Sequence, residues 1–278
     1  MRINKMKFIT PLSNGITYKL VKNYSHTIIL NNQDEINVAS NVGPRPKQED
    51  VVAAGERLGY IFLLVADGMG GHRAGEVASS MVVTELGSKF KSLSTIGSKM
   101  DAVKWLKENI NEVNANIIKY SNEHPEAMGL GTTCVMALLT KDFLMFVNIG
   151  DSSGFVFKNG KLQKITKDHT LVNFLVETGD LSESEAANHP KKNVLMKALG
   201  ATDQCELDIF DVETDVDALM LCSDGLTNML TKEQIEKVLN EEEISVEEKL
   251  IKLIKKSNIR GGQDNISIAY LVKESGAE

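Results

Sequence analysis

The sequence predicts an α+β protein in which helices cover antiparallel sheets, and two observations carry this prediction. Strand patterns follow one another closely from Thr132 to Ile165, and the Asn159-Gly160 pair between two of them is typical of a type I′ hairpin turn. Helical patterns gather in two blocks, residues 74–120 and 231–256, instead of alternating with strands. Strands that succeed one another in this way pair antiparallel, so the pattern disfavours a sheet built from βαβ units.

The predicted strands are short apolar runs rich in β-branched and aromatic residues, which favour extended backbone. The first two, Thr27–Leu30 and Glu35–Ser40, lie on either side of an Asn31–Asp34 turn. The others are Val51–Ala54, Ile61–Ala66, Thr132–Leu139, Phe143–Ile149, Gly154–Phe157, Leu162–Ile165, Glu206–Val212, Ala218–Cys222 and Ile266–Val272.

Helices are predicted where apolar residues recur at spacings of three and four. Ala74–Leu86 and the longer Lys99–Tyr120 form the first block, and Thr231–Leu239 and Val246–Lys256 form the second. Thr231 with Gln234 three residues later fits a capping box, which marks the start of the third helix.

The chain of 278 residues contains no repeat, low-complexity segment or linker, so a single domain is the economical interpretation. Residues 1–25 carry scattered charge and little periodicity, and we interpret them as an N-terminal extension or edge element outside the domain at 26–278. Residues 168–200 are polar and broken, which is typical of an inserted flap. Three short helical pieces are predicted in this flap: Leu171–Glu177, Glu183–Asn188 and Asn193–Ala198.

Composition excludes several classes of function. The net charge of −7 argues against nucleic-acid binding, which usually needs a basic surface. No apolar run is long enough to span a membrane, and the N-terminus lacks the apolar region of a signal peptide. The three cysteines are far apart and lie in or beside apolar runs, so we interpret them as buried thiols of a reducing compartment. A cytoplasmic protein is expected.

The stretch from Tyr60 to Gly75 is the centre of the functional argument. Ile61–Ala66 is predicted to be buried on both faces, and it is followed at once by Asp67-Gly68. A carboxylate at the end of a buried strand needs a positive partner or a metal ion, so our first hypothesis is a cation held by Asp67 and the Gly68 carbonyl. Gly68, Gly70 and Gly75 also fit a dinucleotide-binding turn, and a plain strand-to-helix turn is the third interpretation.

Further carboxylates occur at the ends of predicted strands. Glu49-Asp50 precedes one strand, Asp224-Gly225 follows another, Asp264-Asn265 precedes the last, and Asp151 follows Phe143–Ile149. Mg²⁺ and Mn²⁺ prefer carboxylate, carbonyl and water oxygens, and a pair of such ions suits displacement at phosphorus. Histidine-rich clusters are missing from the sequence, which counts against a zinc enzyme.

At these residues the chain resembles the bacterial form of the PPM-type, or type 2C, metal-dependent serine/threonine protein phosphatases. The motifs that carry the resemblance follow the family's order from about residue 36 to 272. They are Gly43-x-Arg45-x-x-x-Glu49-Asp50, Val65–His72, Gly131-Thr132-Thr133, Asn148–Ser152, Thr166–His169, His189-Pro190 with Asn193, Ala198-Leu199-Gly200, Cys222–Leu226 and Gly262–Asn265.

The resemblance implies a four-layer α/β/β/α sandwich of two antiparallel sheets flanked by helices, with Mn²⁺ or Mg²⁺ at one end. It implies that Asp67 bridges two ions, that Glu49 and the Gly68 carbonyl complete the protein ligands of one ion, and that Asp224 and Asp264 complete those of the other. Asp151 with Asp224 would form a weaker third metal site. Asp50 would orient bound water, and Arg45 would bind the phosphate. The planar guanidinium of Arg45 suits phosphate better than a lysine would.

Two positions depart from the family pattern. Many eukaryotic members have a histidine, assigned as general acid, where this chain has Met69, and a methionine cannot donate a proton. His72 is nearby in sequence and is also a candidate helix cap. An arginine commonly follows the Gly-Asp-Ser segment, and Ser153 stands there instead, which weakens the expected support of Asp151.

The predicted function is hydrolysis of phosphoserine and phosphothreonine in proteins by a metal-activated water, with the flap contacting phosphoprotein substrates of a serine/threonine kinase. Two alternatives stay open: a pseudophosphatase that binds without turnover, and a two-metal hydrolase of small phosphate esters. Loss of a metal carboxylate would favour the pseudophosphatase, and none is lost. Cys222 lies near Asp224 but lacks nearby basic residues, so it is interpreted as a packed strand residue and not as the nucleophile.

Overall fold

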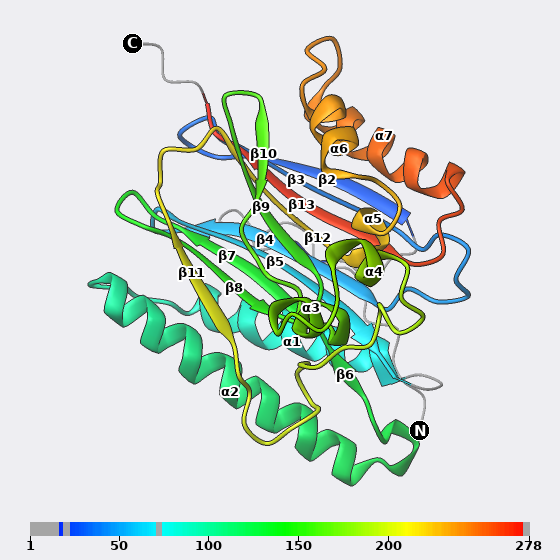
Figure 1. Cartoon of the computed structure of the whole chain (residues 1–278). Coiled ribbons are helices and arrows are strands. Elements are labelled where there is room, and N and C mark those ends of the chain that lie inside the picture. The colour runs from blue at the N-terminus through cyan, green and yellow to red at the C-terminus, as the bar shows by residue number, and fades with distance from the viewer. Residues whose placement is uncertain (1–16, 19–22, 71–73, 275–278) are drawn as a thin grey trace.

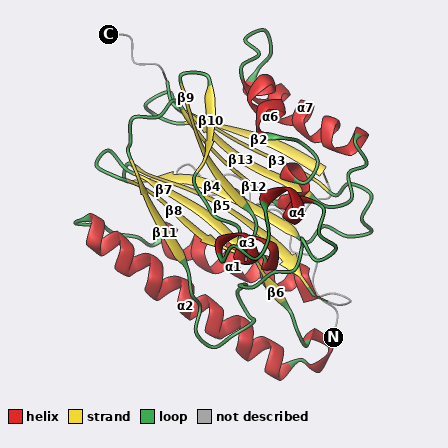
Figure 2. Cartoon of the chain, in the orientation of Figure 1, coloured by secondary structure: helices red, strands yellow, loops and turns green. Residues whose placement is uncertain are grey.

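The computed structural model describes residues 17–18, 23–70 and 74–274. Within these residues two antiparallel sheets lie face to face between two layers of helices, as Figures 1 and 2 show. This is the four-layer α/β/β/α sandwich that the sequence resemblance predicts. The candidate site lies at one end of the two sheets.

In the described part of the chain the first sheet has seven strands in the order β1-β4-β5-β7-β8-β11, with β6 paired to β5. Their bounds are β1 Thr17–Tyr18, β4 Asp50–Arg57, β5 Tyr60–Met69, β6 Gly131–Thr132, β7 Cys134–Leu139, β8 Leu144–Ile149 and β11 Asp208–Val212. The predicted strand Ile61–Ala66 continues to Met69, because Gly68 and Met69 pair with Thr132 and Gly131 of β6.

The second sheet has six strands among the described residues, in the order β10-β9-β12-β13-β3-β2. Their bounds are β2 Asn23–Ile29, β3 Glu35–Asn41, β9 Ser153–Lys158, β10 Lys161–Lys164, β12 Ala218–Cys222 and β13 Ile266–Val272. The predicted hairpin between β9 and β10 is confirmed: Asn159 and Gly160 both have positive φ, 51° and 72°, as a type I′ turn requires.

The helices cover the outer faces of both sheets. Helices α1 (Ala74–Lys91) and α2 (Lys99–Glu123) pack on the first sheet, followed by the short 3₁₀ helix η1 (Pro125–Ala127). Helices α5 (Asp224–Thr227), α6 (Lys232–Leu239) and α7 (Val246–Ile259) pack on the second. The predicted capping box is present, with Thr231 as N-cap of α6 and Gln234 as its partner.

The flap holds α3 (Leu171–Glu177) and α4 (Glu183–Ala187), close to two of the predicted pieces. The third piece, a helix over Asn193–Ala198, is wrong. Leu195 forms an isolated β-bridge with Thr170 and Leu199 forms one with Thr132, so the backbone there is extended. Both bridges join residues distant in sequence, and no local pattern predicts them.

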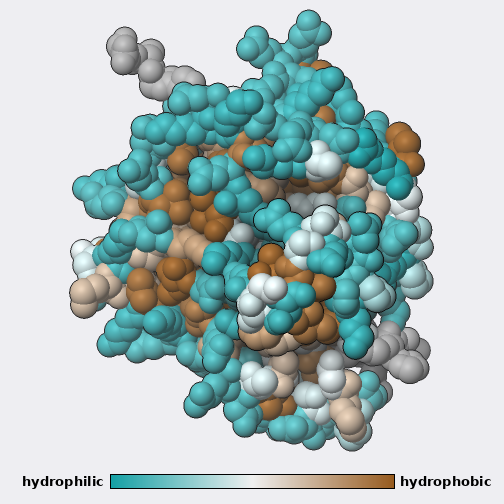
Figure 3. All heavy atoms as spheres, viewed as in Figure 1, coloured by the Kyte–Doolittle hydropathy of each residue, from teal (hydrophilic) through white to brown (hydrophobic). Residues whose placement is uncertain are grey.

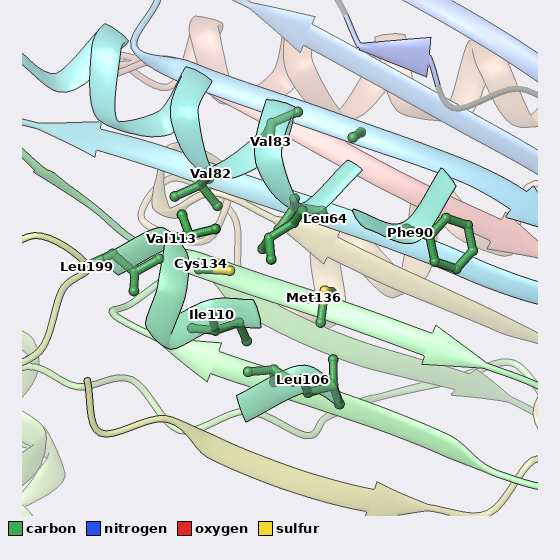
Figure 4. Packing of buried hydrophobic residues seen from close by; sticks show 14 of the residues in the cluster. Leu64, Val82, Val83, Phe90, Leu106, Ile110, Val113, Cys134, Met136 and Leu199 are labelled. Carbon is green, nitrogen blue, oxygen red and sulfur yellow. The ribbon is translucent and has the colours of Figure 1, made fainter. Parts of the chain in front are cut away.

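Three apolar layers hold the sandwich together. Along β5, Phe62, Leu64 and Ala66 face the helices, whereas Ile61, Leu63 and Val65 face the second sheet, because side chains alternate between the faces of a strand. Figure 4 shows part of the first layer, to which Leu64 contributes from the sheet, Phe90 from α1 and Ile110 from α2. The third layer lies between the second sheet and α5–α7.

Candidate active site

Sheet pairing brings the first carboxylates together. Asp50 begins β4 and lies directly opposite Asp67 of β5. Glu49 immediately precedes Asp50, and its carbonyl accepts hydrogen bonds from the Gly68 N–H at 3.1 Å and from the Ser79 hydroxyl of α1 at 2.5 Å. The register of two adjacent strands therefore places Glu49, Asp50 and Asp67 at one end of the sandwich.

A glycine is required at position 68 by the close approach of α1. A Cβ built on Gly68 would lie 2.1 Å from the carbonyl oxygen of Gly75, in the first turn of that helix. The position therefore accepts no side chain, and its backbone carbonyl is free of the shielding that a side chain would give.

The second sheet contributes Asp224 and Asp264 from the ends of β12 and β13. Asn265, beside Asp264, ties the two sheets together. Its Oδ1 accepts from the Glu49 N–H at 2.7 Å, and its Nδ2 donates to the carbonyls of Val42 and Lys47, both at 2.9 Å. One amide side chain thus fixes the loop that carries Arg45 and Glu49.

Asp151 lies in a turn held from several sides. Asn148 Nδ2 donates to the Gly150 carbonyl at 3.1 Å and to the Lys167 carbonyl at 2.7 Å. The Gly150 N–H donates to His169 Nδ1 at 3.1 Å, which leaves His169 Nε2 to donate to Asp208. The turn is therefore supported by His169, although Ser153 occupies a fully buried strand position and offers no cationic side chain.

These residues line one pocket of about 310 Å³. Its walls are Arg45, Glu49, Asp67, Gly68, Met69, Gly70, Thr133, Asp151, Asn193, Leu195, Asp224, Asp264 and Asn265. Asp50 is not among the lining residues: it is only 2% exposed and accepts a hydrogen bond from the Ser223 hydroxyl at 2.7 Å. Every predicted site residue is thus in the pocket or directly behind it.

Arg45 has a partner that the sequence did not predict. Its Nη2 lies 2.7 Å from Asp264 Oδ2, and its Nε donates to the Gln263 carbonyl at 2.8 Å. The Arg45 side chain is 47% exposed, so the guanidinium remains open to the pocket while it is paired.

The carboxylates disfavour one another's charge. Burial, and after it the charges of Asp50 and Asp224, raise the pKa of Asp67 well above its usual range. Burial also raises the pKa of Asp50 to about 7, against the hydrogen bond from Ser223. Burial and the charge of a neighbouring aspartate raise the pKa of Asp151 to about 7 and that of Asp224 to about 6. Such a cluster is stable in its ionised form only beside positive charge.

The chemistry of the site fits divalent cations. Asp224 Oδ1 is buried and has no hydrogen-bonding partner among the described residues. The oxygen-only donor set suits Mg²⁺ or Mn²⁺ and not softer ions. Within the described residues no three His, Cys, Asp or Glu side chains are already arranged as ligands of one ion. The pairing of Asp264 with Arg45 shows that at least one ligand would have to exchange partners.

The pocket does not reveal a general acid. Met69 lines the pocket and packs on Gly131, where a Cβ would lie 2.8 Å from Met69 Cε. His72 lies outside the described residues. Cys222 is fully buried in the layer between the second sheet and the helices, and burial raises the pKa of its thiol, which confirms the interpretation as a packed strand residue.

Sequence reasoning missed the residues that position these carboxylates. The roles of Asn265 and His169 could have been suspected from the motifs in which they stand. Ser223 stands in such a motif too, but only the structure shows that its hydroxyl reaches Asp50. Thr133 likewise stands in a motif, but only the structure shows that its hydroxyl accepts from the Asp67 N–H at 3.0 Å.

The chain is similar to known phosphatases in both sequence and structure. The chain is 42% identical over 208 residues to the serine/threonine phosphatase stp of Listeria welshimeri, covering 74% of this chain and 82% of the relative. The structure matches the S. agalactiae serine/threonine phosphatase with a TM-score of 0.82 at 34% identity, covering 87% of this chain and 100% of that one.

A second solved structure bears on the metal. The catalytic domain of the serine threonine protein phosphatase PstP in complex with two manganese ions matches with a TM-score of 0.73 at 32% identity, covering 86% of this chain and 97% of that one. The sequence model described as Protein phosphatase 2C matches residues 45–254, most of the chain and nearly all of the site. The chain therefore belongs to the protein phosphatase 2C family.

Proposed function

We propose that this protein hydrolyses phosphoserine and phosphothreonine in other proteins and that it depends on two divalent cations, Mn²⁺ or Mg²⁺. The observation that carries the proposal is the convergence of carboxylates from both sheets on one pocket, with the buried Asp224 Oδ1 left unpartnered among the described residues. The manganese-bound relative supports the choice of metal class.

The proposed ligands are distributed over both sheets. Asp67 would be shared by two ions; Glu49 and the Gly68 carbonyl would complete one set, and Asp224 and Asp264 the other. Asp151 with Asp224 would form a weaker third site. When bound, the cations would neutralise the carboxylates, polarise the phosphoryl oxygens and lower the pKa of water in the pocket.

The remaining roles belong to the chain's own side chains. Asp50, held behind the pocket, would orient bound water. Arg45 would exchange its ion pair with Asp264 for two parallel hydrogen bonds to the phosphate. The same exchange would free Asp264 for its ligand role.

A protein substrate suits the surroundings of the pocket. A groove of about 610 Å³ continues from it beneath the flap and shares Asp151, Asn193 and Asp224 with it. Figure 3 shows hydrophobic atoms gathered on this face near α3. Phe174, which belongs to α3, is 51% exposed, and Met196 is 52% exposed. We infer that the groove receives residues that flank the phosphorylated side chain. An extended groove with a largely polar lining, beside exposed apolar side chains, favours phosphoproteins over small phosphate esters. The complete set of carboxylates disfavours a pseudophosphatase.

The setting of the reaction is part of the proposal. The substrates would be products of a serine/threonine kinase in the cytoplasm, and residues 26–278 would act as one phosphatase domain. No helix among the described residues is both long and apolar enough to cross a membrane.

The test is Asp67→Asn, which removes the charge of the proposed shared ligand but keeps the shape of the side chain. We expect turnover of a phosphothreonine peptide to fall by about two orders of magnitude or more at saturating Mn²⁺, because loss of a shared metal ligand removes the activation of water. Asp215→Asn, an exposed aspartate paired with Lys158, is the matched control and should keep full activity. Near-native turnover of Asp67→Asn would contradict the two-metal assignment.

Peptide and aryl phosphate assays on chelated protein, with Mn²⁺ or Mg²⁺ restored separately, distinguish the remaining alternatives. A preference for the aryl phosphate over every phosphopeptide would favour the small-ester hydrolase. Absence of turnover on both, with Mn²⁺ bound, would favour the pseudophosphatase.

A further inference from the structure

A polar cluster occupies the end of the inner core, between the two sheets. Asp50, Ser223, Ser267 and Ser40 come from β4, the end of β12, β13 and β3. Each stands two residues from an apolar side chain that faces the interior between the sheets, namely Val52, Leu221, Ala269 and Val38. Because side chains alternate along strands, all four polar side chains point to the same interior.

The polar side chains of this cluster form a chain that leads from Gln48 towards Asp50. Gln48 Nε2 donates to the Ser40 hydroxyl at 2.7 Å, and the hydroxyls of Ser40 and Ser267 lie 2.8 Å apart. The Ser267 side chain points to the same interior as Asp50, and its hydroxyl lowers the pKa of that carboxyl, as a donor directed at the ionised carboxylate does. An ionised carboxylate can only accept, so Ser267 donates to Asp50 and its oxygen accepts from Ser40.

Ser223 supplies a second donor to the same carboxylate. Its hydroxyl accepts from the Ser267 N–H at 3.0 Å and donates to Asp50 Oδ2 at 2.7 Å. Ser223, Ser267 and Ser40 are 0%, 0% and 3% exposed, so each hydroxyl depends on these bonds to offset the cost of its burial. The chain through Ser40 and Ser267 and the hydroxyl of Ser223 therefore both lead to Asp50.

The strand β2 closes the cluster from the side. Tyr24 lies directly opposite Ser40 in the sheet and packs against the inner core. Ser40 and Ser267 lie outside residues 45–254, which the family model matches, so the comparison assigns them no role.

We propose that Ser267, supported by Ser40 and Gln48, is a positioning residue that fixes the carboxylate of Asp50 in the orientation needed for catalysis. The inference rests on the proposed role of Asp50 in orienting water. Ser267 acts through Asp50 and does not touch the substrate. Hydrogen bonds from two hydroxyls define the carboxylate plane, and loss of one would let the side chain rotate.

The experiment compares Ser267→Ala with Asp50→Asn and with the double variant. We expect Ser267→Ala to lower kcat by about tenfold with little change in KM, and to weaken Mn²⁺ binding measured by calorimetry, as loss of a residue behind metal ligands does. In the Asp50→Asn background the same substitution should have no further effect. Ser40→Ala, one hydrogen bond further away, should show a smaller change in the same direction and serves if Ser267→Ala folds poorly.

Ser257→Ala is the matched control. Ser257 is also a fully buried serine, but it lies on α7, and among the described residues its hydroxyl bonds only to the Leu253 carbonyl of its own helix. It should leave kcat and Mn²⁺ affinity unchanged.

Each outcome decides between the proposals. Wild-type behaviour of Asp50→Asn would overturn the role of Asp50 itself. Impairment of Asp50→Asn, with Ser267→Ala indistinguishable from Ser257→Ala, would overturn the positioning role alone. A Ser267→Ala effect that persists in full in the Asp50→Asn background would overturn it too, because Ser267 would then act by another route.

Discussion

At the scale of single residues, the site depends on side chains whose polar atoms form hydrogen bonds within the protein. The amide oxygen and the amide nitrogen of Asn265 both form hydrogen bonds with the loop that carries Arg45 and Glu49. The Thr133 hydroxyl accepts a hydrogen bond from the backbone of Asp67. Arg45 differs because its ion pair with Asp264 is partly exposed. It is therefore the residue whose removal should affect substrate capture most selectively.

Arg45→Ala should lower kcat/KM for a phosphopeptide by a factor that corresponds to roughly 1.5–3 kcal/mol, the range for a lost charge-assisted hydrogen bond. Steady-state kinetics at saturating Mn²⁺ would measure this loss. Arg57→Ala is the control: Arg57 lies at the far end of β4, where its Nε donates to the Leu93 carbonyl at 2.6 Å. Equal kinetics for the Arg45 variant and wild type would show that Arg45 serves only its loop.

Cys222→Ser should keep most of its activity, because the thiol is fully buried among apolar side chains and burial raises its pKa. The buried hydroxyl should lower stability by about 1–3 kcal/mol if it finds no partner. Turnover and thermal melting would be measured together, with acid quenching to look for a phosphoenzyme. A trapped phosphocysteine would contradict a mechanism in which water attacks the phosphate.

At the scale of elements, the sequence predicted what is encoded locally. The Asn159-Gly160 hairpin and the capping box at Thr231 depend on a few consecutive residues, and both are confirmed. The helix expected at 193–198 is wrong because Leu195 forms a bridge with Thr170, and the adjoining Leu199 forms one with Thr132, both far away in sequence. The site follows the same rule: the motifs indicated which carboxylates meet, but the exchangeable Arg45–Asp264 pair and the serines behind Asp50 depend on side chains brought together only by folding.

Gly160→Ala offers a test at this scale. Gly160 has a φ of 72°, and a Cβ there would lie 3.1 Å from Asn240 Oδ1 at the end of α6. We expect a loss of about 1–2 kcal/mol in the free energy of unfolding, the cost of left-handed backbone for a residue with a Cβ, with kcat unchanged. Chemical denaturation would measure it, and Asn159→Gly, which relieves a similar strain one residue earlier, is the comparison. A stabilised Gly160 variant would mean that the turn changes its type.

At the scale of the whole molecule, the two sheets bring negative charge together at one end of the sandwich. Glu49, Asp50 and Asp67 come from the first sheet side, and Asp224 and Asp264 from the second. The apolar layer between the sheets fixes the strand ends that carry them. The fold therefore stores electrostatic repulsion that a bound cation would relieve, and the repulsion should be visible in the stability of the chelated protein.

Stability of the metal-free protein should fall as pH rises from about 4 to about 7. The pKa values of Asp50 and Asp151 are raised to about 7 and that of Asp224 to about 6, whereas the same groups titrate near 4 when unfolded. Between these values the folded state binds more protons than the unfolded state. Its advantage is complete below the unfolded pKa and disappears as pH passes the folded pKa, at about 1.4 kcal/mol for each unit of pKa difference.

Thermal melting of chelated protein across this pH range would measure the effect, and Mn²⁺ should reverse it most strongly at the alkaline end. Cation at a hundred times its dissociation constant adds about 2.7 kcal/mol through mass action. Asp67→Asn removes one of the repelling charges and one proposed ligand, so its melting temperature should depend less on both pH and Mn²⁺. A melting temperature of the chelated wild type that rises steadily over the same range would mean that the carboxylates do not repel one another in the fold. Relief of their repulsion could then not be what drives the binding of metal.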